Sequence, residues 1–163
     1  MKIDDEYFKG TDLTENHEHN ASCQCGAATY RLTGAPLTCY TCHCTNCQSE
    51  SGGVCTLSMI VNREDVEVTG GEVAVNRYSH KGASMSRHHC AACGSALWFS
   101  AEAMPEYFAL KAGAFDYQAW YQPVAHIWLQ SAQPWLSLQG DAAKFQQQPE
   151  MSQLFGLWAA KYG

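Results

Sequence analysis

From Ala21 onward the apolar positions fall into short runs of β-branched and aromatic residues, separated by Gly, Pro, Asn and Ser. Runs of this length and composition predict strands rather than helices. The strands expected from this pattern cover residues 27–33, 37–43, 54–61, 66–69, 73–79, 84–90, 96–99, 107–112 and 124–129. The chain is therefore expected to be mainly β.

The connections between these runs are short, and two of them contain glycine at the centre. Gly70-Gly71 and Lys81-Gly82 are expected to form hairpin turns, because glycine adopts positive φ without steric cost. Connections this short predict antiparallel pairing. Helical spacing occurs only near the C-terminus, where the apolar positions Met151, Leu154, Phe155, Trp158 and Tyr162 share one face of a helix. We expect this short helix to pack on a sheet.

Residues 1–20 differ from the rest because they are acidic and polar with few apolar positions. We interpret this segment as an N-terminal tail or loosely docked arm. Residues 21–163 are interpreted as a single domain, since a chain of 163 residues is long enough to bury a substantial core.

Charge and composition narrow the possible functions. The net charge is −6 with no run of Lys or Arg, so neither nucleic acid nor an anionic membrane is an expected partner. No apolar stretch approaches the roughly 20 residues of a membrane span, and the N-terminus lacks the pattern of a signal peptide. We therefore expect a cytoplasmic protein. In that compartment nine cysteines indicate metal binding or catalysis rather than disulfides.

Two cysteine pairs far apart in the chain form the first candidate metal site. Cys23 and Cys25 lie in "CQCG", and Cys90 and Cys93 lie in "CAACG". Paired thiolates from two segments are typical of a closed tetrahedral zinc site, and the glycine after each pair suits a tight turn. We interpret these four residues as ligands of a structural zinc ion; four buried reduced cysteines are the alternative.

The second candidate site is the segment "TCHCTNC", which contains Cys42, Cys44 and Cys47. Cys42 and Cys44 share one face of a strand, and Cys47 can return to that face through a turn at Thr45-Asn46. Three ligands leave an open coordination position, as in catalytic zinc sites. Cys39 is the alternative fourth ligand and would close the site, although strand alternation places it on the opposite face.

Other residues are weaker candidates. His43 is expected to be packed behind the ligands, and Cys55 is expected to lie in the core. Arg63, Arg77, Lys81 and Arg87 can recognise carboxylates or be ordinary surface charges. His126, Trp128 and Trp135 can wall the site, although packing in the core is the more common role of such residues.

Several motifs together resemble the glutathione-dependent formaldehyde-activating enzyme family, which includes relatives of centromere protein V. The matching motifs, in order, are "CQCGAATYRLTG", "CHCTNC" with a following "SGG", "TGGE", "RHHCAACGS", "AGAFD" and "AHIWLQSAQPW". The resemblance implies a β-tent of packed antiparallel sheets stabilised by zinc. It also implies two zinc ions per chain, a structural one on Cys23, Cys25, Cys90 and Cys93 and a catalytic one on Cys42, Cys44 and Cys47. Family members commonly carry a basic residue just after the third catalytic cysteine, whereas here Gln48, Ser49 and Glu50 follow it.

The family's type reaction is the addition of glutathione to formaldehyde, which gives S-(hydroxymethyl)glutathione. The leading hypothesis is thus a zinc-dependent carbon–sulfur lyase-type enzyme whose partners are a small-molecule thiol and an aldehyde. One alternative is a non-catalytic, zinc-stabilised binding module whose second zinc site is closed by Cys39. Another is a methionine sulfoxide reductase, but only Cys39 and Cys55 remain for its reactive thiol, and neither has an obvious activating cation.

Overall fold

The computed structural model describes residues 18–80, 82–116 and 121–163 and contains two β-sheets. The smaller sheet has the order β1-β2-β5, with β1 at His19–Ser22, β2 at Thr29–Leu32 and β5 at Val66–Gly70. The larger sheet has the order β11-β10-β3-β4-β9-β8-β7-β6. Its strands are β11 (Ala143–Lys144), β10 (Ala125–Ile127), β3 (Thr38–Cys42), β4 (Thr56–Asn62), β9 (Met104–Lys111), β8 (Ala96–Ala101), β7 (Ala83–Cys90) and β6 (Val73–His80).

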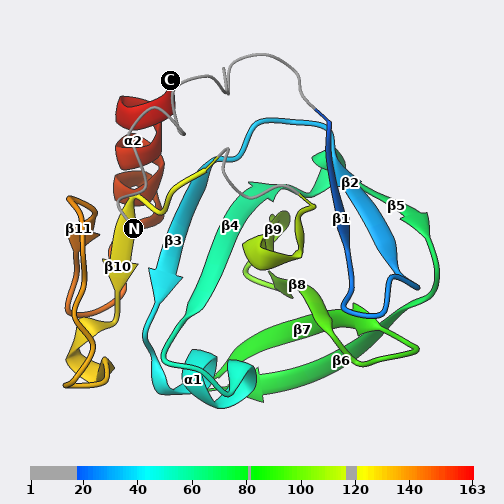
Figure 1. Cartoon of the computed structure of the whole chain (residues 1–163), viewed down its shortest axis with the longest axis horizontal. Coiled ribbons are helices and arrows are strands. Elements are labelled where there is room, and N and C mark those ends of the chain that lie inside the picture. The colour runs from blue at the N-terminus through cyan, green and yellow to red at the C-terminus, as the bar shows by residue number, and fades with distance from the viewer. Residues whose placement is uncertain (1–17, 81, 117–120) are drawn as a thin grey trace, which may run out of the picture.

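The larger sheet curves around the molecule, and the smaller sheet closes its open side (Figure 1). Two α-helices lie against the larger sheet: α1 (Thr45–Ser51) where β3 ends, and α2 (Met151–Tyr162) beside β3 and β10. Within the described residues there are also three single turns of 3-10 helix, at Arg63–Asp65, Ala112–Ala114 and Leu129–Ser131. The mainly β fold with a short C-terminal helix is therefore confirmed.

Each strand expected from the sequence overlaps an observed one, but three elements were not predicted: β1, β11 and α1. The boundary expected after residue 20 falls inside β1, and residues 1–17 lie outside the described residues. Gly71 and Gly82 have the positive φ expected of them; Lys81 lies outside the described residues.

Antiparallel pairing holds through most of both sheets, but β10 pairs in parallel with β3 and with β11. The expectation of antiparallel sheets throughout was therefore wrong at this edge. The reason is the connection, because β10 does not follow β3 through a hairpin but returns to it after a long intervening segment, with His126 opposite Thr41.

The main core lies between the two sheets. Tyr30 from the smaller sheet contacts Trp98 from the larger one edge to face, with ring centroids 5.3 Å apart, and both side chains are buried. Leu32, Met59 and Leu110 are fully buried in the same cluster. Edge-to-face aromatic pairs add about 1 kcal/mol to the stabilisation from burial alone.

A second, smaller cluster lies on the other face of β3. It combines Cys42 with Ala125 and Ile127 of β10 and with Leu154 of α2. This cluster holds α2 and β10 on the sheet and includes one of the candidate metal-binding cysteines. Among the described helices, none is long and apolar enough to cross a membrane.

Leu154 is fully buried in this second cluster, so Leu154→Ala is expected to lower the free energy of unfolding by about 2–5 kcal/mol. Gly156 lies in the same helix but is exposed, with open space where a Cβ would be. Gly156→Ala should therefore raise stability, by up to about 1 kcal/mol, because alanine favours the helix. Urea unfolding of both variants tests these opposite changes in the free energy of unfolding. A loss of stability in both variants would show that α2 is not anchored as described.

Candidate metal centre

Four cysteines from two distant turns form one compact group, which we call the four-cysteine group. Cys23 and Cys25 follow β1, while Cys90 ends β7 and Cys93 lies in the turn before β8. Their sulfur atoms all lie within 4.8 Å of one another, with 3.5 Å between Cys23 and Cys25 and 3.9 Å between Cys25 and Cys90. Corners of a zinc tetrahedron with Zn–S bonds of about 2.3 Å are about 3.8 Å apart, so the group fits a zinc ion.

Both turns of this group have the glycine geometry expected from the sequence. Gly26 and Gly94 each have φ of 75°, and their N–H groups donate to the carbonyls of Cys23 and Cys90, both at 2.9 Å. The N–H of Ala28 donates to the Cys23 sulfur at 3.2 Å and lowers the pKa of that thiol. Backbone donors to sulfur favour the thiolate, which is the form that binds metal.

Cys42, Cys44 and Cys47 form the second group, the three-cysteine group, and α1 brings them together. Cys42 ends β3, Cys44 is the N-cap of α1, and Cys47 lies in the first turn of the helix. The three sulfurs lie within 4.8 Å of one another. The Cys44 sulfur accepts the N–H of Cys47 at 3.4 Å, as an N-cap side chain does. The return of Cys47, expected through a turn at Thr45-Asn46, is made by a helical turn.

Hydrogen bonding within the three-cysteine group separates the pKa values of its thiols. The hydrogen bond with Cys42, and then that with Cys47, lowers the pKa of Cys44, while the hydrogen bond with Cys44 raises the pKa of Cys42. The group thus favours a thiolate shared among its sulfurs. Negative charge held among three sulfurs attracts a cation, and thiolates are suitable ligands for zinc.

Cys39 does not belong to this group. Its side chain is fully buried in the main core between the sheets, and burial raises the pKa of its thiol. Cys42 faces the smaller cluster on the other side of β3. Strand alternation therefore separates the two residues as expected. Across residues 18–80, 82–116 and 121–163, no His, Cys, Asp or Glu joins the three sulfurs as a fourth close ligand atom.

A polar network holds α1 against the chain that follows β10. His43 is buried, and its ring Nε2 lies 3.3 Å from Nδ1 of His126, so it is packed as expected. The side-chain amide of Gln48 donates to the carbonyls of His43 and Ser131, at 2.7 and 2.8 Å. Gln133 in turn donates to the Gln48 carbonyl oxygen at 2.7 Å. These bonds fix the helix that carries Cys47.

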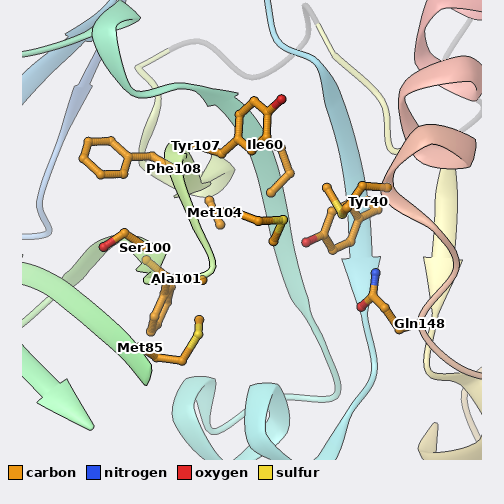
Figure 2. A pocket seen from close by; sticks show the side chains of 12 residues that line it. Tyr40, Ile60, Met85, Ser100, Ala101, Met104, Tyr107, Phe108 and Gln148 are labelled. Atoms are coloured by element: carbon orange, nitrogen blue, oxygen red, sulfur yellow. The ribbon is translucent and has the colours of Figure 1, made fainter. Parts of the chain in front are cut away.

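A cavity of about 330 Å³ opens on the same face of the larger sheet as Cys42. Its side chains are mostly apolar and come from β3, β4, β7, β8 and β9 and from α2. Figure 2 shows Met104 between Tyr40 on one side and Ser100 and Ala101 on the other. Tyr40 and Met151 line the cavity and also pack against the cluster that contains Cys42. These two side chains therefore link the lining of the cavity to the cluster around Cys42, while none of the three cysteines is itself among the lining residues.

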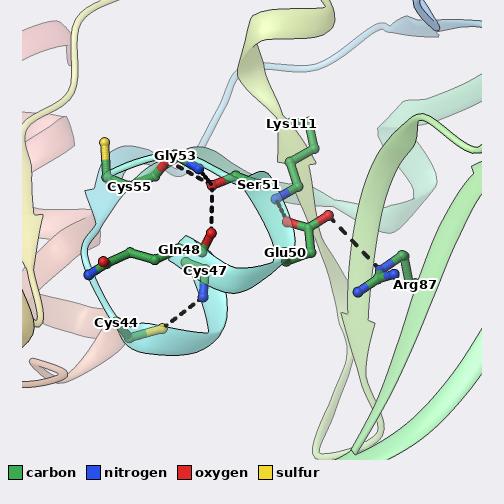
Figure 3. Close-up of polar contacts among 9 residues, drawn as sticks. All are labelled: Cys44, Cys47, Gln48, Glu50, Ser51, Gly53, Cys55, Arg87 and Lys111. Carbon is green, nitrogen blue, oxygen red and sulfur yellow. Dashed lines mark hydrogen bonds and ion pairs between the residues drawn. The ribbon is translucent and has the colours of Figure 1, made fainter.

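An ion-pair cluster lies beside the cavity, at the end of α1 (Figure 3). Glu50 Oε2 accepts a hydrogen bond from Lys111 Nζ at 2.7 Å, and Glu50 Oε1 lies 4.0 Å from Arg87 Nε. The Glu50 and Lys111 side chains are only 16% and 18% exposed. Both cations also lie over the ring of Phe99, which lines the cavity.

Tyr78 on β6 connects this ion-pair cluster to the three-cysteine group. Burial raises the pKa of Tyr78, and the charges of Arg87 and Glu50 also act on it. Negative charge at Cys47 and Cys44 raises its pKa further. The charges of both the ion-pair cluster and the three-cysteine group therefore act on Tyr78.

The remaining sequence candidates lie elsewhere. Arg63 stacks over Phe108 at 5.3 Å, and Lys81 lies outside the described residues. Trp128 packs against the cluster with Cys42, but Trp135 is 71% exposed, so its expected place in the core was wrong. Glu50 and Lys111 were missed as partners because 61 residues separate them and no local motif links them.

Residues 18–131 match the family model of the glutathione-dependent formaldehyde-activating enzymes. This match covers more than two thirds of the chain and includes both cysteine groups. The chain belongs to this family. Helix α2, at Met151–Tyr162, lies beyond the matched residues.

Comparison with curated proteins gives no match. Among solved structures, the chain is similar to a crystal structure of a Rhodobacter sphaeroides protein, with 16% identity and a TM-score of 0.47. The similarity covers 60% of this chain and 87% of that one. The assignment to the formaldehyde-activating family therefore rests on the family match alone.

We expect Cys44→Ala to lose one metal equivalent per chain, because it removes one of three close sulfurs. Cys39→Ala and Cys55→Ala are matched controls, since both remove a thiol outside the two groups. Zinc content measured by atomic emission on protein purified without chelator should fall from two to one only for Cys44→Ala. Loss of an equivalent in Cys39→Ala would place Cys39 among the ligands.

Cys25 is exposed, so Cys25→Ala removes little packing and isolates the contribution of metal to stability. We expect the variant to lower the free energy of unfolding by at least about 3 kcal/mol, because structural zinc contributes folding energy directly. Thermal unfolding with and without a chelator measures this difference. In chelator the variant and the parent chain should unfold alike; a difference that persists there would contradict a metal-based cause.

Proposed function

We propose that this protein is a zinc-dependent carbon–sulfur lyase-type enzyme that adds a small thiol to formaldehyde or a related aldehyde. The supporting observation is the three-cysteine group, which contains no fourth protein ligand among the described residues, and whose cluster shares Tyr40 and Met151 with the lining of a cavity. In a formaldehyde-activating family member, an open position suits catalysis, whereas a closed site suits structure. The reaction resembles that of S-(hydroxymethyl)glutathione synthase, with glutathione or a similar thiol as the donor.

In this proposal the two groups have different roles. Cys42, Cys44 and Cys47 are the catalytic zinc ligands, while Cys23, Cys25, Cys90 and Cys93 hold a structural zinc ion that ties the turn after β1 to the turn after β7. Zinc bound by the three sulfurs would lower the pKa of a thiol that joins them, so that the thiol is deprotonated at neutral pH. The cytoplasmic location and the small-molecule partners expected from the sequence are part of this proposal.

The bond changes in the reaction are simple. The thiol loses its proton, its sulfur forms a bond to the carbonyl carbon, and the carbonyl π pair moves to oxygen, which takes up a proton. The product is a hemithioacetal, and the reverse reaction breaks the same carbon–sulfur bond. Much of the acceleration is expected from holding the thiol and the aldehyde together.

The protein contributes a rigid and partly dry setting for this step. Helix α1 fixes Cys44 and Cys47 relative to Cys42, and the bonds made by Gln48 prevent the helix from moving away from the segment after β10. The cavity lined by Tyr40 provides room for a substrate near the cluster that contains Cys42. This arrangement positions a bound thiol without a large conformational change.

The geometry gives less support to the alternatives. A binding module with its second site closed by Cys39 requires that thiol near the three sulfurs, but it lies in the main core. A methionine sulfoxide reductase requires a reactive thiol, and burial raises the pKa of both Cys39 and Cys55. Enzymatic thiol addition is therefore the function we propose.

The proposal predicts that cobalt-substituted protein changes its thiolate charge-transfer and d–d absorption saturably when glutathione or a simpler thiol is added. Cys39→Ala should respond like the parent chain, whereas Cys44→Ala should not respond. Hemithioacetal formation from formaldehyde, followed by NMR exchange spectroscopy, should be faster with the parent chain and unchanged over background with Cys44→Ala. A cobalt spectrum that no thiol perturbs would overturn the proposal.

A further inference from the structure

The cavity beside the three-cysteine group has a composition that indicates what it binds. Its larger side chains include Tyr40, Ile60, Met85, Phe99, Met104 and Met151. Methionine and aromatic side chains adapt to apolar ligands of varied shape. A cavity of about 330 Å³ is at the small end of ligand sites, large enough for a compact group such as a substituted ring.

The position of the cavity links it to the chemistry of the cysteines. Tyr40 and Cys42 are two residues apart on β3, so their side chains leave the same face of the strand. Tyr40 pairs with Ser58, and Ser58 pairs with Lys111, so one row of the sheet runs from the cysteine side to the ion-pair cluster. A thiol with its sulfur at the cysteines can therefore extend over Tyr40 into the cavity.

The charges along this path are already paired within the protein. Lys111 and Arg87 lie over Phe99, where they would otherwise attract a carboxylate. Glu50 supplies that carboxylate from α1, with a hydrogen bond of 2.7 Å to Lys111 and a looser pairing with Arg87 at 4.0 Å. A carboxylate on the ligand would have to displace Glu50 and leave it largely buried without its partner, which is costly.

We infer that the site selects a thiol whose non-reacting part is apolar and uncharged, and that Glu50 is the residue that excludes carboxylates from it. This inference rests on the proposed function and narrows its donor to thiols without a carboxylate, so glutathione, which has two carboxylates, should bind more weakly than an uncharged thiol. The apolar group occupies the cavity between Tyr40 and Phe99, while the thiol sulfur lies at the three-cysteine group. Glu50 acts on specificity through Lys111 and Arg87 and does not touch the reacting atoms.

The distribution of methionines allows a direct test of the cavity. Of the five methionines, Met85, Met104 and Met151 line it, whereas Met59 is fully buried in the core on the other face of the sheet. In zinc-loaded protein labelled with 13C at the methionine methyl groups, benzyl mercaptan should shift the three cavity signals and leave that of Met59 in place. Single Met→Leu variants assign the signals. Unmoved cavity signals at saturating benzyl mercaptan would overturn the inference.

Charge selection is tested with two thiols, the uncharged benzyl mercaptan and the carboxylate-bearing 3-mercaptopropionate, titrated into cobalt-loaded protein. The parent chain should bind benzyl mercaptan more tightly. Glu50→Gln should raise the affinity for 3-mercaptopropionate about tenfold, because it frees a cation for the ligand carboxylate. The affinity for benzyl mercaptan should change less than about twofold. Glu67→Gln is the matched control, because Glu67 pairs with Arg31 on the smaller sheet.

A double variant separates charge release from damage to α1. Adding Lys111→Met to Glu50→Gln should remove most of the affinity gained for 3-mercaptopropionate, because Lys111, the closer of the two freed cations, is then missing. If Glu50→Gln weakens the binding of both thiols equally, Glu50 has a structural role and the inference fails, although the proposed function stands. If neither thiol alters the cobalt spectrum of the parent chain, the proposed function fails and this inference fails with it.

Discussion

The alternation of side chains along β3 is the constraint on which the site depends. Cys39 and Cys42 are three residues apart, so they leave opposite faces of the strand and join different clusters. The Cys39 thiol lies in the core between the sheets, and the Cys42 thiol lies in the candidate metal centre. A shift of one residue in the register of β3 would exchange these roles, because every side chain would change face. The long pairing of β3 with β4, which matches Thr38 to Ile60 and Cys42 to Thr56, resists such a shift.

The two cysteine groups differ in the kind of backbone that carries them. The four-cysteine group is built from two tight turns, and its sulfurs join segments 65 residues apart in the chain. The three-cysteine group is local, and a strand end and one helical turn suffice to assemble it. The first arrangement ties the smaller sheet to the end of β7, whereas the second groups its sulfurs beside the smaller cluster on β3. Groups of four and of three cysteines are thus produced by different local geometries rather than by different residue types.

Most of the strands could be predicted because glycines and polar clusters separate clearly apolar runs. The exceptions have specific causes: β1 has the polar sequence HNAS, β11 has two residues, and α1 begins with a cysteine rather than a usual capping residue. Both cysteine groups were visible in the spacing of the sequence. The Glu50–Lys111 pair and the network around Gln48 were not, because their partners meet only after β9 and the segment after β10 have been placed in the fold.

Helix α1 combines two properties in seven residues, since it carries Cys47 in its first turn and Glu50 one turn later. The two side chains point to different neighbours, the cysteine toward Cys42 and the glutamate toward β9. A substitution at position 50 can therefore alter the electric field over the cavity while the three-cysteine group stays intact. In a chain with this fold, the charge beside the cavity and the three-cysteine group can thus change independently, one helical turn apart on α1.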